Sequence, residues 1–312
     1  MPRLKPLLLV LAALALCAAA PAPRDAEATL VEELVVNGPP TGPAYWTVSR
    51  GASSVYILGA PALVPKGLRW NTARTETYLK GARVLILPPK ARANPLKLVA
   101  FFWSNGKAFR SARPMEETLP PALKTRFSAA RTRLGKPESR YAKVKPGVAA
   151  VLLGGDFRGR SHLTFSEPID RVKDLASRNG VRQTAASGYD VMPVLKGLTV
   201  MSDAAHQACL ADALTEVEAG DGRIRTAAEG WAHGDVRAAL TAERGFDRCL
   251  AMLPGMSALV DRGMADTANA ISAALARPGK SVAVVPLRQL LAKGGVLDQL
   301  RARGYAIETP RM

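Results

Sequence analysis

Two short apolar runs near the start of the chain have the pattern of strands that are buried on both faces of a sheet. Residues 55–58 and 84–87 are continuous hydrophobic runs, and a turn-forming residue, Gly59 or Pro88, follows each of them. The polar segment 71–80 between them has the length of a helix. The pattern predicts a strand–helix–strand unit of a parallel sheet, with any ligand site just past the carboxyl ends of the strands.

After residue 90 the apolar residues recur at spacings of three and four, which is typical of helices, and prolines separate the segments. The expected helices cover residues 96–109, 123–134, 141–153, 169–179, 204–220, 246–253 and 257–275. Residues 181–185 and 282–285 are expected to be strands, and the glycine-rich segment 154–160 a connector. The chain is therefore predicted to be an α/β protein. Its central, mostly parallel sheet is built from N- and C-terminal segments, and a helical lobe covers about residues 91–277.

The first 28 residues have the layout of a secretory signal peptide followed by the start of a linker. Arg3 and Lys5 precede an apolar run at 7–20, which is too short for a comfortable membrane span and is followed by small residues. Cleavage is expected between residues 19 and 28. Leu16 is bulkier than the small residue that precedes a lipidated cysteine, which argues against a lipoprotein. We therefore expect a periplasmic or secreted protein, with a flexible segment at 29–42 and a single domain at 43–312.

The net charge is strongly positive, with 43 basic and 26 acidic residues and a formal charge of +17. Removal of residues 1–28 takes away three basic and two acidic residues, so the charge falls by one to +16. Such a surface attracts anions. Nucleic acid is not expected, because the basic residues are spread along the chain, aromatic residues are only 5%, and export removes the protein from nucleic acid. Lipopolysaccharide, phospholipid headgroups, acidic polysaccharide or an acidic protein are the expected partners. No further run of membrane-span length follows.

Two cysteines, Cys209 and Cys249, remain once the signal peptide is removed, and both lie on predicted helices. An exported chain with two cysteines can form one disulfide. Two separately buried thiols are the alternative.

Several segments resemble a known protein family. Pro-Ala-Tyr-Trp-x-Val begins at residue 43, Val-Tyr-Ile-Leu-Gly ends at Gly59, and Leu-Val-Pro-x-Gly-Leu-x-Trp ends at Trp70. Trp-x-x-Gly-Asp follows at 231–235, and Gly-Gly-Val-Leu-x-x-Leu-Arg-x-x-Gly-Tyr at 294–305. Together these motifs are similar to the TraB/GumN proteins, relatives of the Tiki membrane proteases, over about residues 43–309. The resemblance implies an α/β fold with a metal-dependent hydrolase site.

The residues that would form this site depart from the family pattern. The first Gly-x-x-His motif starts at Gly59 but has Ala62 in the histidine position, and the family's glutamate falls on Pro88. The second Gly-x-x-His falls on the segment from Pro286 to Gln289. Arg262 lies where members usually carry Arg-Asn.

A catalytic divalent metal needs about three donor side chains and an open position. Alanine and proline offer no donor, and glutamine offers one amide oxygen. The departures therefore predict a pseudoenzyme without catalytic residues, metal or cofactor, which acts as an envelope binding or accessory protein. A hydrolase with a rebuilt metal site is the alternative, and it would use Asp203, His206 or Asp235.

Two further clusters have alternative interpretations. Lys66, Lys90, Arg288 and Lys293 follow the predicted strand ends, so they are either an anion site in place of the metal or ordinary solvated loop cations. Asp203, His206 and Cys209 fall on one side of a predicted helix and resemble half of a zinc site. A disulfide would consume Cys209, and an aspartate at a helix start commonly caps free N–H groups. Capping also explains Ser202 better than nucleophilic activation does.

Overall fold

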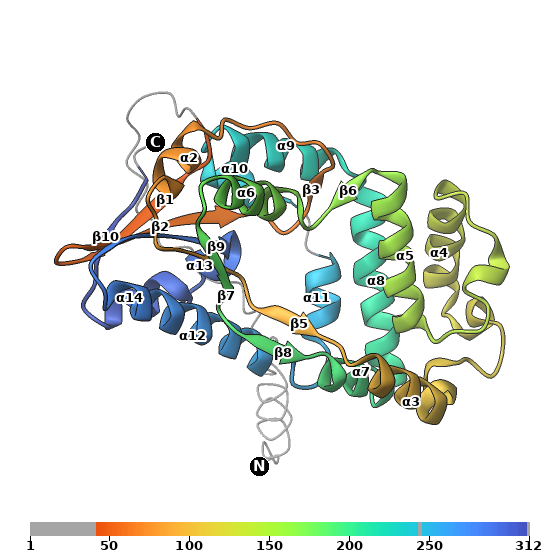
Figure 1. Ribbon diagram of the computed structural model, residues 1–312. Helices are drawn as coiled ribbons and strands as arrows, with labels where there is room; N and C mark the ends of the chain where they lie inside the picture. Colours follow the sequence, from red (N-terminus) through yellow and green to blue (C-terminus); the bar gives the residue numbers. More distant parts are fainter. Residues whose placement is uncertain (1–41, 243–244, 311–312) are drawn as a thin grey trace, which may run out of the picture.

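The chain folds around a six-stranded sheet with a large group of helices beside it (Figure 1). The computed structural model describes residues 42–242 and 245–310. The predicted signal peptide and all but the last residue of the predicted flexible segment 29–42 lie outside these residues.

The sheet has the strand order β10-β1-β2-β9-β4-β7. Its strands are β1 (Tyr45–Arg50), β2 (Ser53–Ala60), β4 (Val84–Leu87), β7 (Arg182–Ala185), β9 (Gly279–Pro286) and β10 (Ala306–Glu308). β2, β9, β4 and β7 are mutually parallel, while β1 runs antiparallel to both of its neighbours. The predicted α/β class with a mostly parallel central sheet is therefore confirmed. One strand, β7, comes from the middle of the chain.

The predicted strand–helix–strand unit is present as β2, α2 (Ala73–Leu79) and β4, but its two strands are not neighbours. β9 lies between them and pairs with both. Residues 281–285 of β9 are all buried, so this strand suits the centre of a sheet that is covered on both faces. A local pattern identifies strands, but it does not show which distant strand inserts between them.

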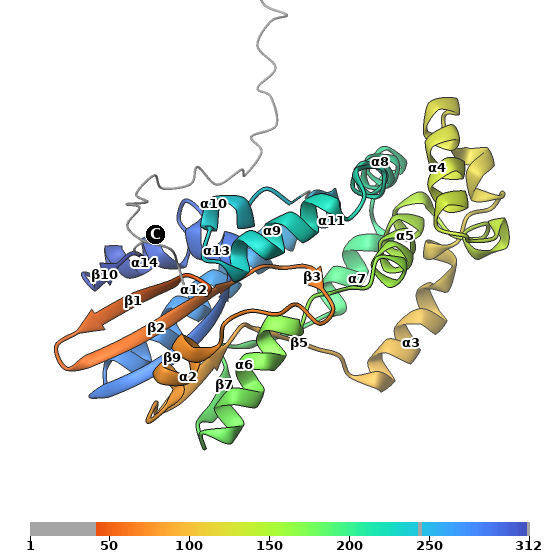
Figure 2. The same cartoon turned by 90° about the horizontal axis from the view of Figure 1, so that it is seen from above.

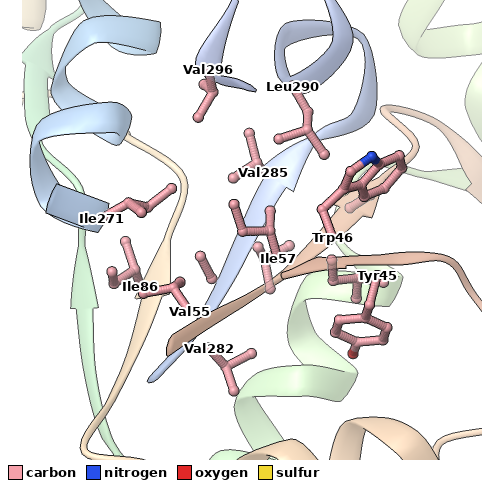
Figure 3. Close-up of a cluster of buried hydrophobic side chains, with 14 of the residues drawn as sticks. Tyr45, Trp46, Val55, Ile57, Ile86, Ile271, Val282, Val285, Leu290 and Val296 are labelled. Atoms are coloured by element: carbon pink, nitrogen blue, oxygen red, sulfur yellow. The ribbon is translucent and has the colours of Figure 1, made fainter. Parts of the chain in front are cut away.

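Helices cover both faces of the sheet. α12 (Met256–Leu275), α13 (Leu287–Leu291) and α14 (Val296–Ala302) pack on one face, and α2 and α6 (Glu167–Arg178) lie on the other (Figure 2). Side chains from the sheet and from the first group interdigitate, among them Val55, Ile57, Val285, Ile271 and Leu290 (Figure 3). These side chains make the first of two hydrophobic clusters.

The second cluster lies in the helical lobe. The lobe contains α3 (Pro95–Asn105), α4 (Pro121–Arg133), α5 (Pro146–Arg160), α7 (Met192–Thr199), α8 (Asp203–Ala219) and α11 (Gly245–Ala251), with 3₁₀ turns at Gly106–Phe109, Met115–Thr118 and Glu138–Arg140. Phe127, Leu153 and Leu210 are among its fully buried side chains. α9 (Gly222–Ala232) and α10 (Val236–Ala239) return to the sheet, because Trp231 and Val236 belong to the first cluster.

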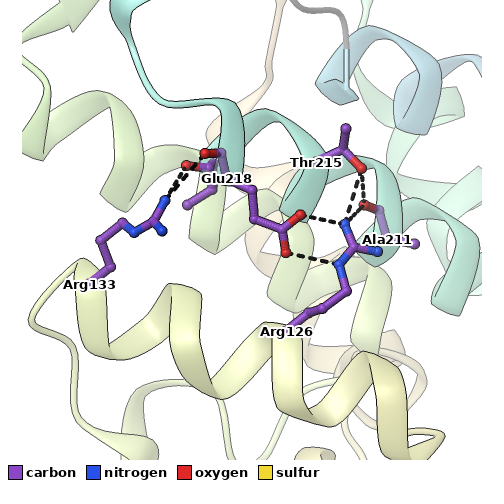
Figure 4. A network of polar contacts seen from close by, with 6 residues as sticks. Arg126, Arg133, Ala211, Thr215 and Glu218 are labelled. Atoms are coloured by element: carbon purple, nitrogen blue, oxygen red, sulfur yellow. Dashed lines mark hydrogen bonds and ion pairs between the residues drawn. The ribbon is translucent and has the colours of Figure 1, made fainter.

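Two short strand pairs connect the sheet with the lobe. β5 (Lys90–Arg92) and β8 (Gly188–Asp190) continue the parallel pair of β4 and β7 beyond the sheet. β3 (Val64–Pro65) pairs with β6 (Leu163–Thr164). Within the lobe, Arg126 of α4 forms an ion pair of 2.8 Å with Glu218 of α8 and also donates to Thr215, while Arg133 donates to carbonyls at the end of α8 (Figure 4).

The prediction of a connector at 154–160 is wrong, because these residues form the second half of α5. Gly154 lies directly under the ring of Phe246 from α11, where an added Cβ would come within 2.2 Å of a ring atom. The glycine therefore serves close helix packing rather than a turn. The predicted disulfide is present: Cys209 of α8 is bonded to Cys249 of α11, across 40 residues of chain.

Candidate functional site

Three adjacent strands end at the edge of the sheet where the site is expected. β2 and β9 run side by side to their ends, with Gly59 opposite Val285 and Ala60 opposite Pro286. β4 pairs with the other side of β9, and Pro88 follows its last residue. The segments that carry Ala62, Pro88 and Gln289 therefore leave the sheet at the same edge, although Gln289 is more than 200 residues from the other two in sequence.

Apolar side chains pack against Gly59 near the end of β2. A Cβ added to Gly59 would lie 2.5 Å from Leu287, 3.0 Å from the ring of Trp46 and 3.3 Å from Leu290. The distance to Leu287 is shorter than packed carbon atoms allow and the other two are tight, so only glycine fits this position without rearrangement. Side chains of α13 and β1 therefore pack directly against Gly59.

The Trp-x-x-Gly-Asp motif fixes α9 and α10 against this strand end. The indole N–H of Trp231 donates to the carbonyl of Gly59 at 2.6 Å, and its ring meets Trp70 edge to face at 5.3 Å. Gly234 has a positive φ of 86°, which favours glycine, and the carboxylate of Asp235 caps α10 by accepting from the N–H of Ala238 at 2.8 Å. Sequence reasoning located this motif but gave it no role. In the structure both residues have structural roles, since Trp231 bonds α9 to β2 and Asp235 caps α10.

Arg262 lies on the exposed side of α12, 4.0 Å from Asp266 and 80% exposed. The next residue, Gly263, faces Pro89, which is 3.8 Å from the position of an added Cβ. α12 therefore passes beside the residues that follow β4, and Arg262 is carried on the part of the helix nearest this edge.

The residues at the strand ends do not fit a divalent metal. Ala62 and Pro88 have no side-chain donor, and Gln289 offers only an amide. Among residues 42–242 and 245–310, no three His, Cys, Asp or Glu side chains gather into a group that could hold a metal ion.

The four basic residues of the proposed anion site come from different elements. Lys66 is exposed after β3, Lys90 is exposed in β5, and Lys293 is exposed between α13 and α14. Arg288 differs, because it donates to the carbonyl of Leu240 at 2.5 Å and to that of Ala242 at 3.2 Å. It thus ties α13 to the end of α10, which is a structural role.

The alternative metal residues have separate roles. Cys209 is consumed by the disulfide, and the cap of α8 is Ser202, which accepts from the N–H of Ala205 at 3.2 Å, rather than Asp203, which is exposed. Asp235 caps α10 in the other part of the molecule. These residues are therefore not gathered into one site.

His206 is buried between α8 and α5. It is 1% exposed, and neither ring nitrogen has a hydrogen-bond partner. A Cβ on Gly147 of α5 would lie 2.4 Å from its Nδ1. Burial, and then the charge of Lys145, lowers the pKa of His206, so the ring is neutral at pH 7. The His206 ring therefore packs between α8 and α5 without a hydrogen bond. The other histidines are exposed, and His233 contacts the carbonyl of Glu229 at 2.8 Å.

Sequence reasoning missed an ionic cluster around the buried Asp156 in the lobe. Asp156 follows two glycines of α5, in the segment for which the glycines predict a connector. Asp156 accepts hydrogen bonds from Arg140 and from the hydroxyl of Tyr141 at 2.6 Å, and Lys136 lies 3.4 Å away. Burial alone would raise the pKa of Asp156, but the hydrogen bonds from Arg140 and Tyr141 outweigh it, and the pKa lies below its usual value. The cluster therefore joins the segment before α5, which carries Lys136, Arg140 and Tyr141, to the second half of α5, which carries Asp156.

Comparison with known proteins supports the resemblance found in the sequence. The model of the TraB/PrgY/gumN family matches residues 44–309. Searches of curated proteins and of solved structures give no match. The match spans the whole sheet, the lobe and all the family motifs except the first residue, Pro43, and on this ground the chain belongs to the TraB/PrgY/gumN family.

Proposed function

We propose that this chain is a non-catalytic member of its family, which acts as a binding or accessory protein in the cell envelope after export. The family scaffold is retained, while the positions that would grip a metal carry Ala62, Pro88 and Gln289. The single observation that carries the proposal is the set of side chains at the strand ends, because Ala62 and Pro88 have no ligand atom and Gln289 offers one amide oxygen. A catalytic metal needs about three donor side chains besides the open position for its water, and these residues do not supply them.

The proposal is tested by assaying peptide hydrolysis with purified protein from which the signal segment has been removed. We expect no turnover above the uncatalysed rate with added zinc, manganese or cobalt, and no effect of a chelator. Turnover that a chelator abolishes would instead support the second candidate, a hydrolase of the family type with relocated catalytic groups. The separate roles of Cys209, His206 and Asp235 weigh against that candidate.

The ligand that the envelope role requires is proposed to be anionic, on the ground of the net charge of +17 and the cations near the strand ends. Lys66 and Lys90 carry this part of the proposal, because both are exposed and each follows a strand, β3 and β4, in the segments that leave the sheet. Arg288 is less suited, since its guanidinium already serves two carbonyls.

Melting temperatures in rising phosphate test the anion site. We expect phosphate to raise the melting temperature of the wild type more than that of Lys66→Ala/Lys90→Ala. The matched control is Lys80→Ala/Lys124→Ala, which removes two other exposed lysines and lowers the net charge equally. Equal shifts in all three proteins would mean general screening of a cationic surface, and the anion site would then be abandoned.

A further inference from the structure

The helix α3 exposes an apolar face that no other part of the described chain covers. Leu96 is 81% exposed, Val99 67%, Phe102 48% and Trp103 90%. These positions follow a spacing of three, three and one, which places them on one side of the helix. Single exposed apolar residues are common, but four on one helical face mark a surface that is covered in use.

The opposite face of α3 carries Phe101, which borders a shallow groove together with Met192 and Lys196 of α7. Phe101 is only 8% exposed, and its ring contacts those of Phe102 and Phe109. Asn94 caps the first turn by accepting from the N–H groups of Leu96 and Lys97, and Pro95 stands at the first helical position. The apolar face is therefore presented by a helix whose first turn is capped within the chain. α3 lies at the outer margin of the lobe, away from the sheet (Figure 1).

The charge around α3 indicates what covers this face. Residues 90–114 contain six basic residues and no acidic one: Lys90, Arg92, Lys97, Lys107, Arg110 and Arg113. In space, Lys97 lies in a shallow groove with Lys196 and Asp190, and Asp190 is committed in part to the N–H of Met192. An exposed apolar face with a cationic margin is the pattern of helices that lie in the interface of a membrane with anionic lipids.

Two other occupants fit less well. A second copy of the chain would bring the same cationic margin against itself, which like-charge repulsion opposes. The segment ahead of the described residues is also basic over residues 1–24, with Arg3, Lys5 and Arg24 and no acidic residue.

α3 is too short to span a membrane. It has 11 residues, or about 16 Å of helix, whereas a span needs about 20 residues. In the described part of the chain no helix is both long and apolar enough to cross a bilayer.

We propose that α3 is a membrane-surface anchor, which lies in the plane of an anionic phospholipid bilayer with its four exposed apolar side chains among the acyl chains. The flanking lysines and arginines meet the headgroups. The inference rests on the proposed envelope location and gives that role an interaction surface. It does not depend on what the strand ends bind.

Trp103 is an intrinsic probe for this contact. Of the four tryptophans, Trp46 and Trp231 are each 2% exposed, Trp70 is half-buried against Trp231, and Trp103 is the one open to solvent. Mixing the protein with vesicles of phosphatidylglycerol and phosphatidylcholine is expected to shift its emission to shorter wavelength. The protein should also sediment with these vesicles, but not with vesicles of pure phosphatidylcholine.

Substitutions distinguish insertion of α3 into the bilayer from non-specific hydrophobic adsorption of the protein. Leu96→Ser/Trp103→Ser is expected to lower vesicle partitioning by at least about tenfold, because each side chain loses more than about 1 kcal/mol of apolar transfer. Lys97→Gln and Lys107→Gln should each lower it about fivefold, from about 1 kcal/mol per surface lysine. The control Val151→Ser/Phe165→Ser removes one aliphatic and one aromatic side chain that are exposed elsewhere on the lobe, and should partition like the wild type.

Three results would overturn the anchor. They are wild-type protein that stays in solution with phosphatidylglycerol vesicles, a Leu96→Ser/Trp103→Ser variant that still binds them, and a wild-type dimer that this variant converts to monomer. Unchanged melting temperatures would show that the variants are folded. A chelator-sensitive hydrolase activity would refute the proposed function without altering vesicle binding, so the two failures are distinguishable.

Discussion

Asp156 illustrates how a side chain acquires a role that its sequence context hides. In the sequence it lies between glycines and arginines, which favoured a loop. In the structure it is 8% exposed and accepts hydrogen bonds from Arg140 and Tyr141, which lie 15 or 16 residues earlier. Sequence reasoning identifies which residues can ionise. It does not identify their partners, because these are brought into contact only by the tertiary fold.

The lowered pKa of Asp156 makes a prediction about pH. The ionised form is favoured in the folded state, so its contribution to stability is present above the unfolded pKa of about 4 and is lost as the pH falls through the lower folded value. Asp156→Asn should therefore lower the free energy of unfolding by about 2 kcal/mol at pH 7, because charged hydrogen bonds are lost. The difference from the wild type should shrink below about pH 4. Denaturant unfolding at pH 7, 5 and 3 measures it, and a difference that is constant down to pH 3 would contradict the assignment.

Trp231 makes a second prediction at the residue scale. Trp231→Phe keeps an aromatic ring but removes the N–H that satisfies the carbonyl of Gly59. We expect the free energy of unfolding to fall by about 1–3 kcal/mol, because a buried acceptor is left without a donor. Trp103→Phe is the control, since Trp103 is 90% exposed and its replacement should leave stability within about 0.5 kcal/mol. Equal effects of the two substitutions would mean that the indole N–H has no structural role.

At the scale of elements, apolar periodicity predicted most of the α-helices and the four parallel strands of the central sheet, because a buried face imposes its period on the sequence. It missed β1, β10 and the short strand pairs. β4 begins and ends at the predicted residues, and α8 differs from its predicted range by one residue at each end. α5 was cut short at residue 153, because three glycines in seven residues are typical of a loop. Here one of them makes room for Phe246.

Neighbouring glycines of α5 should respond in opposite directions to the same substitution. Gly154→Ala places a methyl group 2.2 Å from the ring of Phe246 and is expected to destabilise the protein by about 1–3 kcal/mol through overpacking. Gly155 is exposed, and the nearest atom to its added Cβ is 3.9 Å away, so Gly155→Ala should stabilise by up to about 1 kcal/mol through helix propensity. Melting temperatures that move in the same direction would refute this packing of α5 against α11.

The disulfide predicts where reduction acts. Cys209 and Cys249 both belong to the hydrophobic cluster of the lobe, and their bond closes 40 residues, which contributes roughly 4 kcal/mol in the chain-entropy model. Cys209→Ala/Cys249→Ala should therefore increase amide exchange in α8 and α11 more than in β2 and β9. Exchange that rises equally in the sheet would mean that sheet and lobe unfold as one cooperative unit.

At the scale of the whole molecule, the sequence predicted the class of fold but not its connectivity. The insertion of β9 between β2 and β4 depends on a pairing across more than 190 residues, which no local period encodes. The resemblance to a family could place the candidate site, since its motifs end up at neighbouring strand ends. It could not show that Gly59 is packed against Leu287 and Leu290, because such contacts come from side chains that are distant in sequence.

The separation into a sheet cluster and a lobe cluster also gives the molecule two distinct surfaces. The strand ends belong to the sheet with its surrounding helices, and α3 lies at the outer margin of the lobe (Figure 1). An accessory protein that holds a membrane through one part and a ligand through the other follows from the two proposals together. Either surface can be altered by substitution without touching the other.

Metal stoichiometry tests the central claim, the absence of a metal site at the strand ends, most directly. Purified protein is dialysed to equilibrium against micromolar zinc, manganese or cobalt, and the bound metal is measured per chain beside a variant with donors restored, Ala62→His/Pro88→Glu/Gln289→His. We predict far less than one ion per chain in the wild type at a concentration that fills a typical catalytic site. One tightly bound ion per wild-type chain, lost on substitution of residues at the strand ends, would contradict the account.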